Sequence, residues 1–221
     1  GFSASVSKYL TDNLSGFIAD YDTEFDLDLV VKASKAIHEK TSPVVHGSQG
    51  EVNFSEGEKL VSFSNAVLEG EIHRDTGRVN ICAFDREQVV ITSLLSVVSY
   101  IGVHRKLFLL HGASADIEGE GFVFCGSSSS EKSTLAEGLI RIDENVRGDE
   151  FCCIEICDPP KLHSFPFNSK QVFVGESANL KSIFFISGHG DNNIVLLEKA
   201  EAFSLLLKNI VAVNSYWSLK G

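Results

Sequence analysis

Residues 126–134, with the sequence GSSSSEKST, have the residue types and spacing of a phosphate-binding loop. In such a loop a glycine begins the run, and a lysine followed by a hydroxyl-bearing residue ends it. Backbone N–H groups hold the phosphate oxygens, the lysine neutralises their charge, and the hydroxyl helps to bind Mg²⁺. The sequence therefore predicts a site for ATP and Mg²⁺. Its candidate residues are Gly126, Ser127, Ser128, Ser129, Ser130, Glu131, Lys132, Ser133 and Thr134.

Two positions in this run depart from the usual pattern. Glu131 stands where the motif has its second glycine, and Ser129 stands where many such loops have another. A side chain at either position restricts the backbone and crowds a bound phosphate. A carboxylate ~4 Å from a phosphate charge costs on the order of 4 kcal/mol at an effective dielectric constant of about 20. The alternative interpretation is a helix N-terminus with a serine-rich cap.

The sequence around the loop predicts the elements that would position it. An apolar strand over Gly121–Cys125 leads into the loop, and a helix over Ser133–Ile142 follows it. The other elements predicted in this half are strands at Leu107–His111, Glu150–Cys157, Gln171–Val174, Leu180–Ile186 and Asn193–Leu197, a loop at Pro159–Pro166 and a helix at Lys199–Val213. This order of elements favours an α/β domain over residues 106–221.

Residues 1–105 are predicted to form a β-rich region packed on that domain. A turn at Asp75–Gly77 separates two strand-like stretches and indicates a β-hairpin. Leu29–Ile37 fits either a strand or a helix. The other predicted elements are strands at Glu51–Phe54, Lys59–Phe63, Leu68–Arg74 and Arg78–Phe84 and a buried helix at Arg86–Val103. No proline or glycine linker separates the halves, so the boundary near residue 105 is expected to be a packing boundary.

Composition excludes several classes of protein. Of the 221 residues 43% are hydrophobic, which is enough for a packed core and excludes a mainly disordered chain. A net charge of −11 argues against a nucleic-acid-binding protein, which needs a basic face. The longest apolar runs fall short of the ~20 residues of a membrane span. The five cysteines lack zinc-site spacing and are expected to be reduced, as in a cytoplasmic protein.

Acidic residues gather at residues 20–28, and a solvated strand or turn explains them as well as a partner site does. The histidines other than His111 show no partner pattern and are expected to be structural or solvated. Cys125, which directly precedes the loop, is expected to be a buried apolar residue.

The stretch from His111-Gly112 through Gly121–Gly126 to Lys132-Ser133-Thr134 resembles the core of the HPr kinase/phosphorylase family. In that family a His-Gly pair ends one strand, a short hairpin returns, and the next strand leads into the phosphate-binding loop. Arg147-Gly148-Asp149-Glu150 stands where the family has a paired acidic motif at the end of the following strand. The resemblance covers roughly residues 107–213.

This resemblance implies a phosphoenolpyruvate carboxykinase-like nucleotide-binding fold with a mixed sheet, and transfer of a phosphoryl group from ATP to a hydroxyl of a protein or small molecule. Lys132 would contact the β- and γ-phosphates, and Ser133 and Glu150 would hold Mg²⁺. Asp149 would be the general base, and His111 would tune or relay its proton. HPr kinases are hexamers, so the resemblance also implies a homo-oligomer.

Three alternatives to this interpretation stay open at the level of sequence. His111 is a structural histidine in one, and Asp149-Glu150 is a polar turn in another. Glu131, and Glu150 in place of the family's second aspartate, favour a divergent member over an HPr kinase proper. The third alternative is therefore an inactive relative that acts as a peptide-binding or regulatory module.

Overall fold

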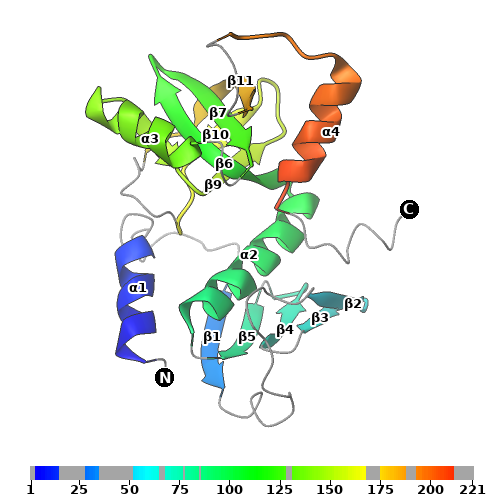
Figure 1. Ribbon diagram of the computed structural model, residues 1–221. Helices are drawn as coiled ribbons and strands as arrows, with labels where there is room; N and C mark the ends of the chain where they lie inside the picture. The colour runs from blue at the N-terminus through cyan, green and yellow to red at the C-terminus, as the bar shows by residue number, and fades with distance from the viewer. Residues whose placement is uncertain are drawn as a thin grey trace. The chain divides into compact units, whose positions relative to one another are not determined.

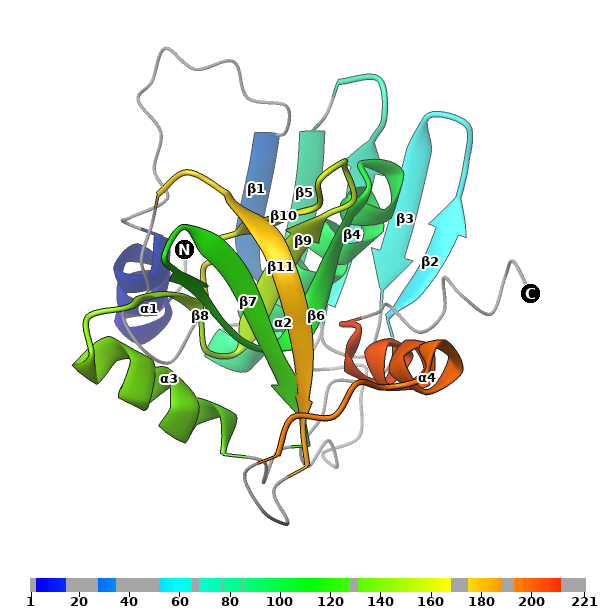
Figure 2. The same ribbon diagram turned by 90° about the horizontal axis from the view of Figure 1, so that it is seen from above.

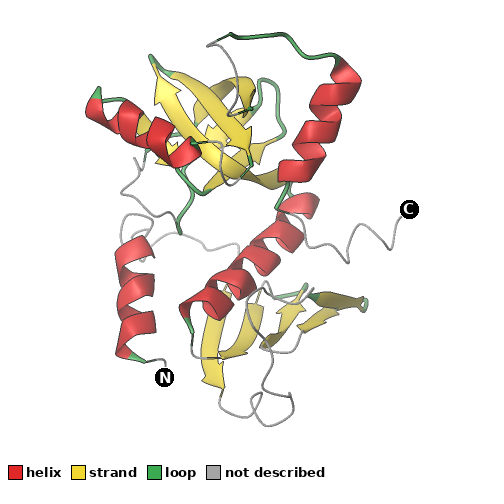
Figure 3. Ribbon diagram, in the orientation of Figure 1, coloured by secondary structure: helices red, strands yellow, loops and turns green. Residues whose placement is uncertain are grey.

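The computed structural model describes residues 3–14, 28–34, 52–64, 68–76, 78–84, 86–127, 131–167, 175–187 and 193–211. They form two compact units, one ending at Tyr100 and the other running from Ile101 to Val211. Each unit contains one sheet, so the fold is mixed α/β, as the sequence predicts (Figures 1 and 3). Within the described residues, no helix is long and apolar enough to cross a membrane.

The first unit is built on a five-stranded sheet of order β1-β5-β4-β3-β2. β1 pairs with β5 in parallel, and the other pairs are antiparallel. Alternating side chains point into its core; in β3, for example, Val61 and Phe63 are buried while the serines between and after them are exposed. The elements are α1 (Ala4–Leu14), β1 (Asp28–Ser34), β2 (Asn53–Glu56), β3 (Leu60–Ser64), β4 (Leu68–His73), β5 (Arg78–Phe84) and α2 (Glu87–His104), which ends in the second unit.

The predicted strands and hairpin of this unit are confirmed, and so is the buried helix. β1 resolves the ambiguity of Leu29–Ile37 in favour of a strand over its first residues, while residues 35–37 lie outside the described residues. α1 was not predicted. Of the acidic stretch at residues 20–28, residues 20–27 lie outside the described residues, and Asp28 begins β1.

The second unit has a six-stranded sheet of order β7-β11-β10-β9-β6-β8. β7 also pairs with β6, so five of these strands form a closed ring. β11 runs parallel to β7, and the other pairs are antiparallel. The elements are β6 (Leu107–Ile117), β7 (Glu120–Gly126), α3 (Lys132–Arg141), β8 (Asn145–Gly148), β9 (Phe151–Glu155), β10 (Lys161–His163), β11 (Ala178–Ile186) and α4 (Lys199–Asn209).

The two faces of this sheet carry separate clusters of apolar side chains. On the face that points into the ring, Leu110, Val123 and Ile154 form a buried cluster. Leu206 of α4 and Ile210, which directly follows this helix, pack against the cluster. On the other face, small alanines of β6 allow α3 to approach closely, with Leu139 packed against them. α3 and α4 therefore lie on opposite sides of the sheet, as both views show (Figures 1 and 2).

Most predicted elements of the second half are confirmed, and three differ. The strand at Leu107–His111 extends to Ile117, because its second half gains β7 and β8 as partners. The predicted loop at Pro159–Pro166 contains β10, which is too short for a period to be recognised. The predicted strand at Asn193–Leu197 is wrong, since these residues pair with no strand among those described. Residues 171–174 lie outside the described residues.

Candidate functional site

Three neighbouring strands bring the predicted site residues together. Gly112 of β6 lies opposite Cys125 of β7, the residue before Gly126. On the other edge of β6, the Gly112 N–H donates to the carbonyl oxygen of Glu150 at 3.1 Å. The end of β7, the His111-Gly112 pair and the acidic pair therefore lie side by side in the sheet.

The acidic pair interrupts what is otherwise one continuous strand. β9 pairs with the first half of β6 and β8 with the second half, in the same antiparallel direction. Asp149 and Glu150 form the bend between them. A Cβ atom on Gly148 would lie 2.3 Å from the carbonyl oxygen of Phe151, so only glycine fits this bend. Gly148 thus allows the bend that brings the Glu150 backbone to Gly112.

Lys132 is the buried cation of the site, with 7% of its surface exposed. Its Nζ donates to the carbonyl oxygens of Gly126 and Ser127, at 2.7 and 2.8 Å. These charge-assisted hydrogen bonds tie the first turn of α3 to the end of β7. The ammonium group is therefore held where the predicted phosphate-binding loop leaves the sheet.

Glu131, the residue before Lys132, has the backbone conformation that the motif's glycine would favour. Its φ of 61° and ψ of 23° are left-handed, which is uncommon for a residue with a side chain. It occupies the N-cap of α3, is exposed, and makes no capping hydrogen bond within the described residues. Glu131 therefore does not support the alternative in which this segment is only a helix N-terminus capped by a side chain.

Of the remaining loop residues, the structure describes two and leaves three outside the described residues. Ser133 and Thr134 are exposed in the first turn of α3. Ser128, Ser129 and Ser130 lie outside the described residues.

The two carboxylates have different surroundings. Asp149 is 1% exposed, whereas the side chain of Glu150 is 46% exposed. Glu150 Oε1 lies 3.7 Å from Nδ1 of His111, within ion-pair range when the imidazole is protonated. The edge of the His111 ring also contacts Phe151, at 6.2 Å between centroids. His111 thus contacts Glu150 and Phe151.

A buried ion pair that the sequence did not reveal lies beside the acidic pair. Nη2 of Arg147 is 2.9 Å from Oδ2 of Asp116, and the two side chains are 3% and 14% exposed. Arg147 Nη1 also donates to the hydroxyl of Ser164 at 3.4 Å. The pair joins β8 to β6 two residues before Asp149. Both residues stand among other polar residues and glycines, so no local pattern signalled the pair.

The cysteines around the site are free thiols, and those in the ring are buried. Burial raises the pKa of Cys125 to about 12, although the positive charge of Lys132 acts in the opposite direction. Burial also raises the pKa of Cys153, to about 11, with the charge of Glu155 adding to it. These thiols therefore stay protonated at neutral pH, as expected for apolar core residues.

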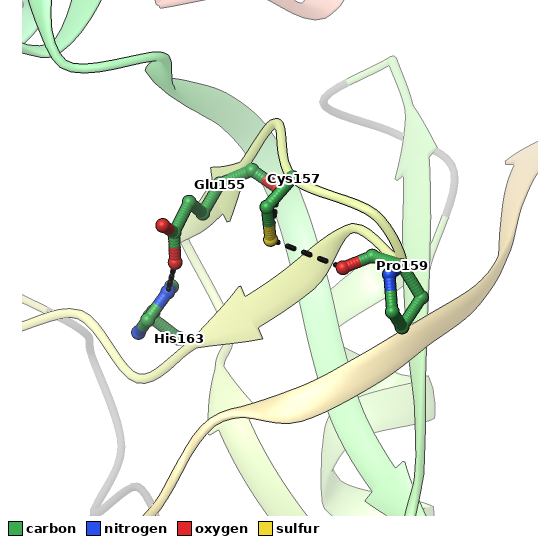
Figure 4. A network of polar contacts seen from close by, with 4 residues as sticks. All are labelled: Glu155, Cys157, Pro159 and His163. Carbon is green, nitrogen blue, oxygen red and sulfur yellow. Dashed lines mark hydrogen bonds and ion pairs between the residues drawn. The ribbon is translucent and has the colours of Figure 1, made fainter.

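A second polar network lies at the far end of β9, where Glu155 pairs with Leu107 (Figure 4). His163 Nε2 is 2.9 Å from Oε2 of Glu155, and the thiol of Cys157 donates to the carbonyl oxygen of Pro159 at 3.0 Å. His163 thus has a partner that the sequence did not indicate. The described part of the chain contains no cluster of three or more metal-ligating side chains.

No model of a known protein family matches this chain, and neither does any curated protein.

Proposed function

We propose that the second unit binds ATP with Mg²⁺ at the β7–α3 loop and transfers a phosphoryl group to a hydroxyl, in a phosphoenolpyruvate carboxykinase-like fold related to the HPr kinases. One observation carries this proposal: the end of β7 to which Lys132 is hydrogen-bonded, the His111-Gly112 pair of β6 and the Asp149-Glu150 bend lie next to one another. Phosphoryl transfer needs a phosphoryl donor, a cation and a base at one place. Lys132 would supply the cation here and Asp149 the base.

Lys132 would exchange its two carbonyl partners for phosphate oxygens. The exchange keeps the ammonium group hydrogen-bonded, and it replaces neutral acceptors by charged ones, which bind more strongly. Asp149, which is buried next to Glu150 in the bend, would accept the proton of the attacking hydroxyl. His111 would orient the acidic pair through its contact with Glu150.

The residues present fit a nucleotide-bound Mg²⁺. Such an ion is usually held by one or two carboxylates, phosphate oxygens and waters rather than by a cage of protein ligands. The exposed hydroxyl of Ser133 and the half-exposed carboxylate of Glu150 would supply the protein's share. When bound, Mg²⁺ would neutralise charge on the transferring phosphoryl group.

A second candidate function is an inactive scaffold that binds a peptide or protein. Glu131 favours it, because its carboxylate stands at the N-terminus of α3, where a phosphate would otherwise find the positive end of the helix dipole. The exposure of Glu131 supports the kinase instead, because a solvated carboxylate repels a neighbouring phosphate less. The two functions differ in whether the wild-type chain binds ATP.

Calorimetric titration of ATP and Mg²⁺ into the wild-type chain tests the proposal. Lys132→Ala removes the cation, and Lys181→Ala, an exposed lysine of β11, is the matched control. The kinase predicts micromolar binding that Lys132→Ala abolishes and Lys181→Ala leaves unchanged. Asp149→Asn should retain binding and lose ATP turnover. ATP binding by Glu131→Gly but not by the wild type would favour the inactive scaffold. No ATP binding by the wild type or by Glu131→Gly would refute a phosphate site.

A further inference from the structure

Arg147 occupies a bulge in β8, two residues before Asp149, the first residue of the acidic bend. One step along β6, from Ser114 to Ala115, is matched by two steps along β8, which makes Arg147 the extra residue of that strand. Bulges are frequent next to active sites, where they re-aim a side chain. Here the buried guanidinium is aimed at the carboxylate of Asp116 on β6.

The ion pair between Arg147 and Asp116 does more than fill the protein interior. Both groups lose hydration on burial, and an apolar pair of similar volume is often as stable or more stable. The property that an apolar pair lacks is direction, because a charge-assisted hydrogen bond holds its two groups at one distance and angle. At 2.9 Å, this pair fastens β8 to β6 directly before the acidic bend.

The segment that follows β10 contacts the chain on both sides of the acidic bend. Phe165 packs edge-on against Phe151, the residue after Glu150, with 6.3 Å between ring centroids and 74° between ring planes. The hydroxyl of Ser164, the residue before Phe165, accepts a hydrogen bond from Nη1 of Arg147 at 3.4 Å. The bend is therefore bracketed by two contacts with the same two-residue segment.

We propose that Arg147 is a positioning residue that fixes the acidic bend against β6 through Asp116 and Ser164. A general base must lie within hydrogen-bond reach of the proton that it removes, so the place of the bend would set how well Asp149 works. The catalytic meaning of this inference rests on the proposed function. Whether Arg147 fixes the bend can be measured without ATP.

Amide hydrogen exchange followed by NMR reports the place of the bend, because the Gly112 N–H donates to the carbonyl oxygen of Glu150. The reference is the Ile156 N–H, which donates to the carbonyl oxygen of Lys106 at 2.7 Å beyond the other end of β9. Arg147→Lys keeps the positive charge but lacks the planar fork through which arginine reaches two partners. It should speed exchange at Gly112 roughly tenfold or more and leave exchange at Ile156 unchanged.

A second variant separates positioning from stability. Arg147→Met with Asp116→Val replaces the ion pair by apolar side chains and should keep the free energy of unfolding in urea close to that of the wild type. Because an apolar contact lacks direction, exchange at Gly112 should still be fast. Arg141→Met, which changes an exposed arginine of α3, is the matched control and should leave exchange at Gly112 unchanged.

ATP turnover, measured as phosphate release, tests the part that rests on the proposed function. Both Arg147 variants should turn over ATP roughly 10- to 100-fold more slowly and bind it within about twofold of the wild type, because a displaced base slows the reaction and leaves Lys132 in place. Exchange that changes equally at Gly112 and Ile156, or at neither, overturns the proposal, and so does turnover equal to that of the wild type. A wild type that turns over no ATP refutes the proposed function instead, and exchange at Gly112 then decides by itself whether Arg147 fixes the bend.

Discussion

The left-handed backbone of Glu131 leads to a prediction with an unusual sign. Two variants, Glu131→Gly and Glu131→Ala, both remove the carboxylate but differ in the backbone conformations that they allow. At an ordinary helical position alanine is more stable than glycine by about 1 kcal/mol. At a φ of 61° the order should be reversed, because a Cβ atom costs roughly 1–2 kcal/mol there.

The magnitude follows from opposing contributions. Glycine relieves the left-handed strain but loses about 0.5–1 kcal/mol through the greater freedom of the unfolded chain. Both variants lose the same interaction of the carboxylate with the helix N-terminus, so it cancels in the comparison. The glycine variant should therefore be more stable than the alanine variant by about 0.5–1 kcal/mol.

Thermal and urea unfolding of the two variants, followed by circular dichroism, measure this difference. Glu131→Gly should melt a few degrees above Glu131→Ala. The same order in ATP affinity would show that the loop needs a left-handed residue before Lys132 in order to bind phosphate. An alanine variant as stable as the glycine variant, or more so, would refute the left-handed conformation and the glycine equivalence drawn from it.

Three further predictions concern the sheet around the site. Gly148→Ala should destabilise the chain by about 3 kcal/mol or more in urea unfolding, because the new Cβ would meet the Phe151 carbonyl, a backbone atom that cannot easily move. Arg147→Met should cost about 3 kcal/mol by the same measurement, since it leaves Asp116 without its buried partner; an effect below 1 kcal/mol would contradict that role. The raised pKa of Cys125 means that the folded state holds its thiol proton more tightly than the unfolded state, so its contribution is complete below pH 9, the unfolded pKa, and is lost as the pH rises toward 12. Unfolding free energies at pH 8 and pH 10.5 should differ less in Cys125→Ala than in the wild type, and equal differences would exclude this contribution.

Local sequence determined the elements that carry the candidate site. The apolar run before Gly126 and the helical pattern that begins near Lys132 are properties of neighbouring residues, and β7 and α3 follow them. The hairpin at Asp75–Gly77 and the long helix α2 were predictable for the same reason, because turn residues and a helical apolar stripe act over a few residues.

Tertiary structure alone decided which of these elements lie together. The packing around β6 places the Glu150 carbonyl beside Gly112 and brings Arg147 to Asp116, 31 residues away in the sequence, and no local pattern encodes either contact. Two of the differences between prediction and structure have the same origin. β10 is a strand because β9 and β11 both offer it hydrogen bonds, whereas Asn193–Leu197 has strand-like residues and no such partner among the described strands. A strand is completed by hydrogen bonds to a neighbour that is distant in sequence, so its residues can favour it but cannot determine it.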